Sequence, residues 1–226
     1  MNTVRRYSGL VMFSHSIFSF SFTALAALTA SGGLLRLLEG FLISLAFLGG
    51  RTCANALNRV IDGRIDAKNP RTASRHIPSG TVSVFEAIAI VAISFAVLTV
   101  CAFFLNPLCV MLLPVAGVLF VFYSFTKRFT WLCHVILGVV CAGASVGAWI
   151  AVLGRIDWPV LVLAGANAAW VAGFDIIYAI QDIEFDRGEN LHSIPLRFGR
   201  KGALLIAAAA HAGAVVALIA FGFFVG

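Results

Sequence analysis

The chain has 226 residues, of which 61% are hydrophobic and only 12% are charged. A soluble domain carries about 25% charged residues, so this composition excludes an ordinary soluble globular protein and indicates a protein of the lipid bilayer. The net charge of +6 does not indicate a nucleic-acid-binding protein, because the basic residues alternate with long apolar runs instead of covering one soluble face.

Apolar runs of 18 residues or more recur along the chain, and each can cross a hydrocarbon core of about 30 Å as a helix. The first run follows Arg5 and Arg6 and is too long for the apolar core of a signal peptide. We therefore predict an all-α, polytopic transmembrane bundle that forms a single domain over residues 1–226. Its seven spans are predicted at 10–35, 39–60, 83–104, 108–125, 131–153, 158–181 and 202–225.

The basic residues predict the orientation of these spans. Lysine and arginine collect on the cytoplasmic side of membrane proteins, and thirteen of the sixteen lie before the first span or near alternate loops. Arg36 and Arg155 lie in the opposite loops, and Arg51 lies within a span. The pattern predicts a multi-pass protein of the cytoplasmic (inner) membrane with its N-terminus in the cytoplasm. The thirteen residues are Arg5, Arg6, Arg59, Arg64, Lys68, Arg71, Arg75, Lys127, Arg128, Arg187, Arg197, Arg200 and Lys201.

The acidic residues also cluster, although the orientation rule does not require it. Seven of the ten lie at or near the cytoplasmic ends of the second and sixth spans. At 100° per residue, each of these helix ends carries a polar stripe on one face. The first stripe contains Arg51, Asn55, Asn58, Asp62 and Asp66, and the second contains Asp175, Tyr178, Asp182 and Asp186.

A polar stripe on a membrane helix has to face the bundle interior or a water-filled cavity, because exposing charge to lipid is costly. We therefore expect both stripes to line one cavity. The alternative interpretation is that these residues are polar caps at the membrane interface, but such caps would not need to lie on one face of each helix. Carboxylates that face one another repel unless hard cations lie between them, and such oxygen ligands suit Mg²⁺. Bridged through Mg²⁺ to a diphosphate, they would form an ionisation site in which the metal takes up charge from the leaving group.

Basic residues on the same side offer partners for a diphosphate. Lys127 and Arg128 follow the fourth span, while Arg71, Arg75 and Arg197 lie in polar loops. Some of them are candidates to clamp diphosphate oxygens, and the alternative explanation is the charge bias of cytoplasmic loops.

Two features inside the spans have competing interpretations. Arg51 either pairs with a neighbouring polar side chain or binds an anionic group of an acceptor. The motif Gly143-x-x-x-Gly147 is interpreted as a close contact between helices.

These motifs strongly resemble those of the UbiA superfamily of intramembrane prenyltransferases. The resemblance runs nearly end to end, and two Asp motifs at the right separation make it specific. It is carried by His15-Ser-Ile-Phe, Asn58-x3-Asp62-x3-Asp66, the loop from Asn69 to Gly80, Tyr123-Ser-Phe-Thr-Lys127-Arg128, Tyr178-Ala-Ile-Gln181-Asp182-x3-Asp186 and Ser193-Ile-Pro195-Leu-Arg197.

The resemblance implies a helical bundle that binds a polyprenyl diphosphate through Mg²⁺, with the prenyl chain in a tunnel open to lipid. An aromatic acceptor would capture the allylic carbocation, as in prenyltransferases that act on 4-hydroxybenzoate or a dihydroxynaphthoate in ubiquinone and menaquinone biosynthesis. The implied catalytic residues are Asp62, Asp66, Asp182 and Asp186, which together with Asn58 would hold Mg²⁺. The candidate substrate-binding residues are Asn58, Arg51, Lys127, Arg128, Tyr178, Asp175, Arg71 and Arg197.

Members of this family usually have nine spans, whereas this chain ends at Gly226 after the seventh. The resemblance therefore implies a UbiA-like fold that lacks its last two helices. The expectation is either a shortened chain or a tunnel closed differently, for example by a second protomer of a homo-oligomer.

Three other functions remain as alternatives. A CDP-alcohol phosphotransferase also uses membrane carboxylates, but Asp62-Gly-Arg-Ile-Asp66 does not match its single acidic run. A membrane cation transporter would be expected to place its acids near the bilayer centre rather than at one cytoplasmic mouth. A UbiA-type prenyltransferase with a different acceptor fits the same residues.

Overall fold

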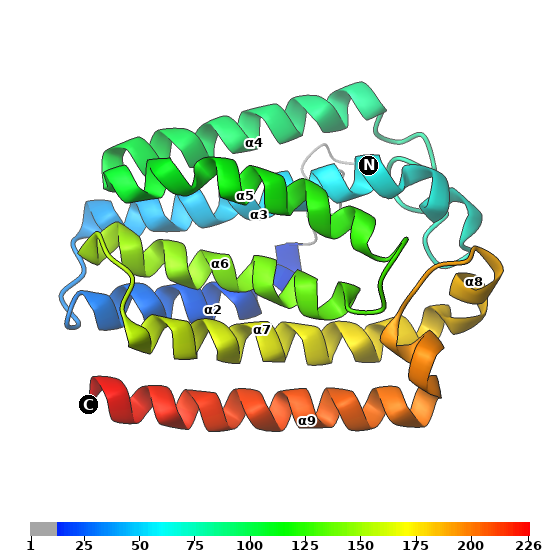
Figure 1. Cartoon of the computed structure of the whole chain (residues 1–226). Helices are drawn as coiled ribbons and strands as arrows, with labels where there is room; N and C mark the ends of the chain where they lie inside the picture. The colour runs from blue at the N-terminus through cyan, green and yellow to red at the C-terminus, as the bar shows by residue number, and fades with distance from the viewer. Residues whose placement is uncertain (1–12) are drawn as a thin grey trace.

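The computed structural model describes residues 13–226, with side chains described from residue 18 onward. Within this part of the chain all regular secondary structure is helical, and seven long helices run alternately back and forth (Figure 1). A 3₁₀ turn, η1 (Ile180–Asp182), and a short helix, α8 (Ile183–Gly188), lie between the last two. The long helices are α2 (Phe13–Ala30), α3 (Leu37–Lys68), α4 (Val84–Leu105), α5 (Pro107–Thr126), α6 (Cys133–Leu153), α7 (Trp158–Ala179) and α9 (Ile194–Val225).

Each predicted span corresponds to one long helix, so the all-helical fold class is confirmed. Six helices are long and apolar enough to cross a membrane: α3, α4, α5, α6, α7 together with its continuation to Gly188, and α9. The part of α2 whose side chains are described, Phe18–Ala30, is a shorter apolar helix. The protein is therefore a multi-pass membrane protein. The predicted cytoplasmic N-terminus with Arg5 and Arg6, and the side chain of His15, lie outside the described residues.

Two predicted spans are too short. The second was predicted to end at residue 60, but α3 continues to Lys68 and carries both Asp62 and Asp66 on regular helix. Hydropathy stops early because it scores these carboxylates as solvent-facing, although their residues are only 3% and 4% exposed. The last helix begins at Ile194 rather than 202 and has a kink at Gly199, whose φ of 69° is a conformation that suits glycine.

Small residues allow the helices to approach closely. α6 packs along α7, α7 packs along α9, and α3 packs along α4. At Gly138 of α6, an added Cβ would collide with the backbone carbonyl of Ala168 in α7. The predicted close contact at Gly143 and Gly147 is wrong, since a Cβ at either position would meet open space.

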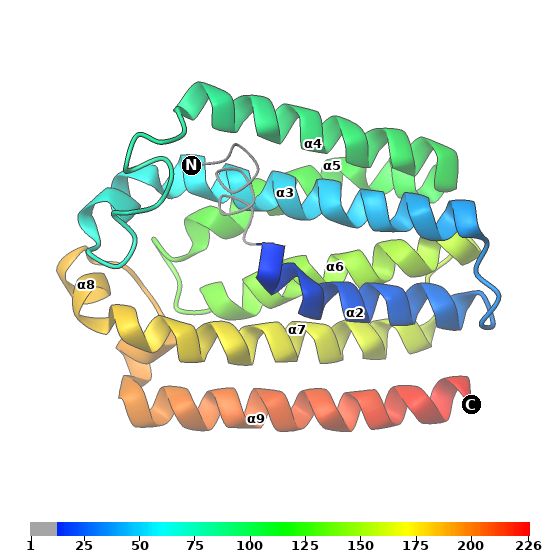
Figure 2. The same ribbon diagram turned by 180° about the vertical axis from the view of Figure 1, so that it is seen from behind.

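The polar loops gather at one end of the bundle. The loop between α3 and α4, the α5–α6 loop and α8 lie at this end, and the C-terminus lies at the other (Figures 1 and 2). The loop after α3 begins at the C-cap residue Asn69 and is held by its own turns, in which the amides of Thr72 and Ala73 both donate to the Asn69 carbonyl. The loops at this end therefore surround the polar stripes at the ends of α3 and α7.

Candidate active site

A cavity of about 540 Å³ opens among α3, α5, α6, α7 and α8 at this end of the bundle. The structure brings both polar stripes to it. The lining residues from the two stripes are Arg51, Asn55, Asn58, Asp62, Asp66, Asp175, Tyr178, Asp182 and Asp186.

The second stripe does not lie on one unbroken helix, as the sequence predicted. α7 ends at Ala179, the next three residues form the 3₁₀ turn, and α8 then carries Asp186. The turn changes the direction of the chain, yet Asp182 and Asp186 still line the cavity.

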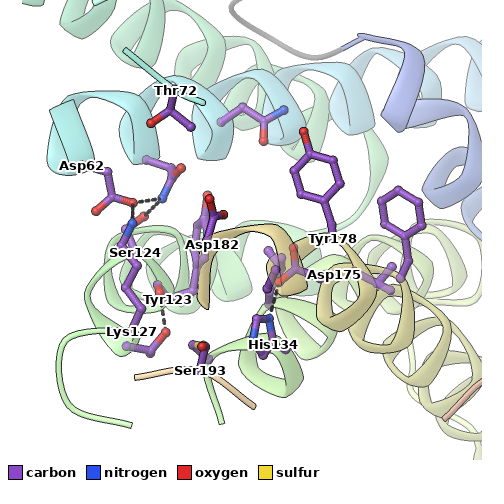
Figure 3. Close-up of a pocket in the computed structure, with 18 of the residues that line it drawn as sticks. Asp62, Thr72, Tyr123, Ser124, Lys127, His134, Asp175, Tyr178, Asp182 and Ser193 are labelled. Atoms are coloured by element: carbon purple, nitrogen blue, oxygen red, sulfur yellow. Dashed lines mark hydrogen bonds and ion pairs between the residues drawn. The ribbon is translucent and has the colours of Figure 1, made fainter. Parts of the chain in front are cut away.

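Asp62 lies on α3 against the end of α5. Its Oδ2 is 2.7 Å from Lys127 Nζ, and its Oδ1 is 3.4 Å from Arg128 Nη2. Asn58, one turn earlier, donates from Nδ2 to Asp62 Oδ2 at 2.9 Å and to Ser124 Oγ at 3.2 Å. Figure 3 shows Asp62, Ser124 and Lys127 together at one side of the cavity. The amide orientation leaves the Asn58 oxygen directed away from these two bonds.

Asp66 is held by arginines from its own helix and from the following loop. Arg75 Nη1 lies 2.8 Å from both carboxylate oxygens, and Arg59 Nη1 lies 3.6 Å from Oδ2. The hydroxyl of Thr72 donates to the backbone carbonyl of Asp66 at 2.9 Å. The loop is therefore tied to the end of α3 through both backbone and side chain.

Asp182 receives its partners from the same loop. Arg71 donates through Nε to Oδ1 at 2.9 Å and through Nη2 to Oδ2, while Asn69 Nδ2 donates to Oδ1 at 2.9 Å. The Asp182 carboxylate raises the pKa of the Arg71 guanidinium by accepting these bonds. The same guanidinium donates to Tyr178 Oη at 3.2 Å and lies 4.8 Å from the centre of that ring.

These ion pairs correct one step of the sequence argument. The expectation that only hard cations offset the repulsion between the carboxylates is wrong, because lysine and arginine side chains are paired with Asp62, Asp66 and Asp182. Within residues 18–226, three or more acidic, histidine or cysteine side chains do not come together as a ready-made metal centre. Asp186 lines the cavity and forms no ion pair with any residue in that range.

Two of the candidate substrate-binding residues lie outside the cavity lining. Arg128 is partly exposed and donates to the backbone carbonyl of Ile61 at 3.0 Å besides its contact with Asp62. Arg197 is exposed, and its guanidinium lies over the rings of Trp131 and Phe198. Of these two, only Arg128 touches a residue of the polar stripes.

Comparison with known proteins identifies the family of this chain. The model of the UbiA prenyltransferase family matches residues 19–226. The chain belongs to this family. A 4-hydroxybenzoate octaprenyltransferase of Shewanella loihica is 35% identical over 182 residues, which are 78% of this chain and 62% of that protein. The corresponding protein of Shewanella woodyi is 32% identical over 185 residues, with 81% and 64% covered. The chain thus spans a little under two thirds of these relatives' length.

Solved structures share the fold of this UbiA family member. The apo structure of a UbiA homolog from Aeropyrum pernix K1 superposes with a TM-score of 0.84 at 37% identity, covering 92% of this chain and 80% of that one. A UbiA homolog from Archaeoglobus fulgidus, solved with GPP and Mg²⁺, has a TM-score of 0.75 at 20% identity, with 98% and 79% covered. Membership of the UbiA family removes the CDP-alcohol phosphotransferase interpretation.

Sequence reasoning missed two residues of this candidate site. Asn69, directly after the first stripe, bonds Asp182. His134, near the start of α6, is 4% exposed, and its Nδ1 lies 2.7 Å from Asp175 Oδ2 (Figure 3). A histidine at the beginning of an otherwise apolar span was the available signal, since such a side chain has to find a polar partner in the bundle.

A second cavity, also of about 540 Å³, continues from the first between α2, α3, α5 and α6. Its lining is mostly apolar and includes Gly143 and Gly147, which explains why these glycines face open space. The two cavities share several lining residues where they meet. These are Ser19, Arg51, Asn55, Tyr123, Leu137 and Cys141.

Proposed function

We propose that this protein transfers a polyprenyl group from a polyprenyl diphosphate to an aromatic acceptor of the 4-hydroxybenzoate or dihydroxynaphthoate type, in ubiquinone or menaquinone biosynthesis. One observation carries the proposal: a polar cavity that holds both Asp motifs adjoins an apolar cavity and shares lining residues with it. A substrate with a diphosphate head and a long apolar tail matches this pair of cavities. The names of the Shewanella relatives support the acceptor class.

The polar cavity fits a diphosphate accompanied by Mg²⁺. Hard oxygen donors that converge on one space suit this ion, and the fold accepts GPP and Mg²⁺ in the Archaeoglobus homolog. Bound there, the metal would supply positive charge to the leaving diphosphate. We propose that the ligands are Asn58, Asp62, Asp66, Asp182 and Asp186.

The basic partners of the carboxylates then serve the donor. Lys127 and Arg71, now paired with Asp62 and Asp182, line the cavity and would turn to diphosphate oxygens once the donor is bound. Both side chains are partly exposed to the cavity, so this exchange requires no unfolding.

Arg51 stands where the two cavities meet and is proposed to bind the acceptor's carboxylate. Its Nη1 is 3.2 Å from Cys141 Sγ, and its Nε is buried without a hydrogen-bond partner among the described residues. A guanidinium with a buried, unused donor is suited to an anionic ligand. We also propose that this end of the bundle faces the cytoplasm, because the basic loops gather there.

The test is a transfer assay on the protein reconstituted in lipid nanodiscs. Prenyl diphosphates of several lengths are offered with 4-hydroxybenzoate or a dihydroxynaphthoate, with and without Mg²⁺, and diphosphate and prenylated product are measured separately. We expect both products in the presence of Mg²⁺ and one acceptor class to be preferred. Diphosphate release without any prenylated ring would contradict aromatic transfer, and no release from any donor would contradict the proposal as a whole.

A further inference from the structure

A buried histidine holds a carboxylate at the wall of the polar cavity. His134 Nδ1 lies 2.7 Å from Asp175 Oδ2, and the histidine side chain is 6% exposed while that of Asp175 is 32% exposed. The imidazole Nε2 is buried and has no hydrogen-bond partner among the described residues. The ring therefore contributes one hydrogen bond, to Asp175, in a cavity wall that both residues help to line.

The other oxygen of Asp175 is the chemically available one. No residue in the described part of the chain hydrogen-bonds Asp175 Oδ1, and Asp175 lines the cavity. The ion pairs that occupy Asp62, Asp66 and Asp182 do not extend to it. In Figure 3, Asp175 lies apart from the Asp62–Lys127 group, on the side of Tyr178 and His134.

Arg51 lies in the same region as this pair. Its guanidinium contacts Cys141 Sγ at 3.2 Å, and Cys141 lies on α6, the helix that carries His134, and lines the same cavity as Asp175. Trp170 and Phe174, which lie on α7 with Asp175, line the same cavity. The wall thus offers a cation for a carboxylate, a free carboxylate oxygen and aromatic rings, which together match a hydroxylated aromatic acid.

We propose that Asp175 Oδ1 takes the hydroxyl proton of the aromatic acceptor and that His134 positions Asp175 for this step. The inference rests on the proposed function and adds the base that activates the acceptor. Asp175 would be a catalytic residue because it touches the reacting hydroxyl. His134 would be a positioning residue, in the way that a carboxylate and an imidazole orient each other in other enzymes.

The step balances without any further reactant. The donor C–O bond breaks and its electron pair leaves on the diphosphate, while a ring π pair forms the new C–C bond. As this bond forms, positive charge develops on the ring, and the hydroxyl proton passes to Asp175 Oδ1 in the same step, which leaves a dienone with no positive charge on its ring. The ring C–H proton leaves to a diphosphate oxygen, its electron pair restores the aromatic ring, and Asp175 returns its proton to the acceptor oxygen.

The first experiment separates donor ionisation from acceptor prenylation in nanodiscs. Asp175→Asn should lower product formation about 100-fold or more, the range expected for loss of a general base. Diphosphate release from the donor without acceptor should stay near the wild-type rate, because the pairs around Asp62 and Asp182 are intact. Asp157→Asn makes the same chemical change at the other end of the bundle, where Asp157 pairs with Arg155, and should leave both rates unchanged. Product formation by Asp175→Asn near the wild-type rate would overturn the proposal.

A second measurement distinguishes proton transfer from a packing role. An acceptor whose hydroxyl is already ionised at the assay pH, for example through ring fluorination, needs no base. The ratio of Asp175→Asn to wild-type turnover should rise at least about tenfold with this acceptor. An unchanged ratio would show that Asp175 does not act on the hydroxyl.

The positioning role of His134 has its own matched pair of variants. His134→Leu removes the bond to Asp175 and should lower kcat for acceptor prenylation by about 10- to 100-fold, as loss of an orienting partner does. His134→Asn places an amide donor near the position of Nδ1 and should restore most of kcat. Equal loss in both variants, or a loss confined to protein yield, would contradict positioning.

Binding measurements keep the inference testable apart from turnover. The wild type should bind 4-hydroxybenzoate more tightly than benzoate, or a dihydroxynaphthoate more tightly than naphthoate, and Asp175→Asn should remove this preference. Preference without any transfer would support the acceptor site while contradicting the proposed function. Transfer by the wild type together with equal binding of hydroxy and deoxy acids would contradict only the inference.

Discussion

Arg71 forms a bidentate pair with Asp182 through two hydrogen bonds, although the two residues are 111 positions apart in the chain. Arg71 belongs to the loop that follows the first Asp motif, and Asp182 belongs to the second motif. Asn69 adds a third bond to the same carboxylate. The two halves of the site are therefore connected by a short loop segment, and its geometry depends on the fork of the guanidinium.

Because both bonds come from one guanidinium, we predict that lysine cannot replace Arg71 without loss of activity. Arg71→Lys keeps the charge but retains only one of the two bonds, so we expect kcat/KM for the prenyl donor to fall about tenfold. Arg187→Lys is the matched control, because Arg187 pairs with Glu184 within α8 and both side chains are largely exposed. Steady-state kinetics against donor concentration measure the effect. A wild-type value in Arg71→Lys would show that bidentate geometry does not matter there.

Asp62→Asn and Asp182→Asn should each reduce prenyl transfer more than about 100-fold, since each removes charge at the proposed metal and diphosphate site. EDTA should have the same effect on the wild type, and added Mg²⁺ should reverse it. Size-exclusion profiles of the variants in detergent should match the wild type because both substitutions keep the side-chain shape. Undiminished turnover in either variant, or with EDTA, would remove the metal hypothesis.

Lys127→Ala should chiefly weaken donor binding. The ammonium lies 2.7 Å from Asp62 and lines the cavity, so its loss should raise the donor KM about tenfold or more and change kcat less. Arg197→Ala tests a cation that the sequence also nominated but that the structure stacks on Trp131, away from the cavity. Its donor KM should equal that of the wild type. A larger effect in Arg197→Ala than in Lys127→Ala would reverse these assignments.

Arg51→Ala should mainly raise the KM for an acceptor that carries a carboxylate, by about tenfold, which corresponds to roughly 1.4 kcal/mol. With an acceptor of the same ring but without the carboxylate, the variant and the wild type should differ little. Competition between the two acceptors in one reaction gives the ratio of their kcat/KM values directly. An effect on the donor alone would reassign Arg51 to the diphosphate.

The apolar cavity predicts control of prenyl length. Gly147 lines this cavity and has open space where a side chain would extend, so Gly147→Leu should place apolar bulk in the path of the chain. We expect preference to shift toward shorter donors by on the order of tenfold, since a few methylenes are discriminated to that degree. Gly213→Leu makes the same change on the exposed face of α9 and should not shift the preference. The shift is measured by offering a mixture of prenyl donors of different lengths and quantifying the chain lengths of the products.

The sequence alone determined the class of the protein and predicted nine of the polar side chains that line its cavity. Seven apolar runs were enough for the helices, because a bilayer forces every backbone polar group to be satisfied within a helix. The same cost of exposing charge predicted that both stripes turn inward, and all nine of their residues line one cavity. Local spacing sufficed for these conclusions, since neighbours on one helix face are a property of the helix itself.

The tertiary structure decided which charges meet. The pairing of Arg71 with Asp182, and of Lys127 with Asp62, joins segments that the sequence places far apart, and no periodicity reports such partners. The 3₁₀ turn at Ile180–Asp182 likewise redirects Asp186 without a sequence signal for a helix end. The contact of His134 with Asp175 could be found only in the structure. Contacts between helices depend on how whole helices pack, and the sequence pattern within one helix does not encode that packing.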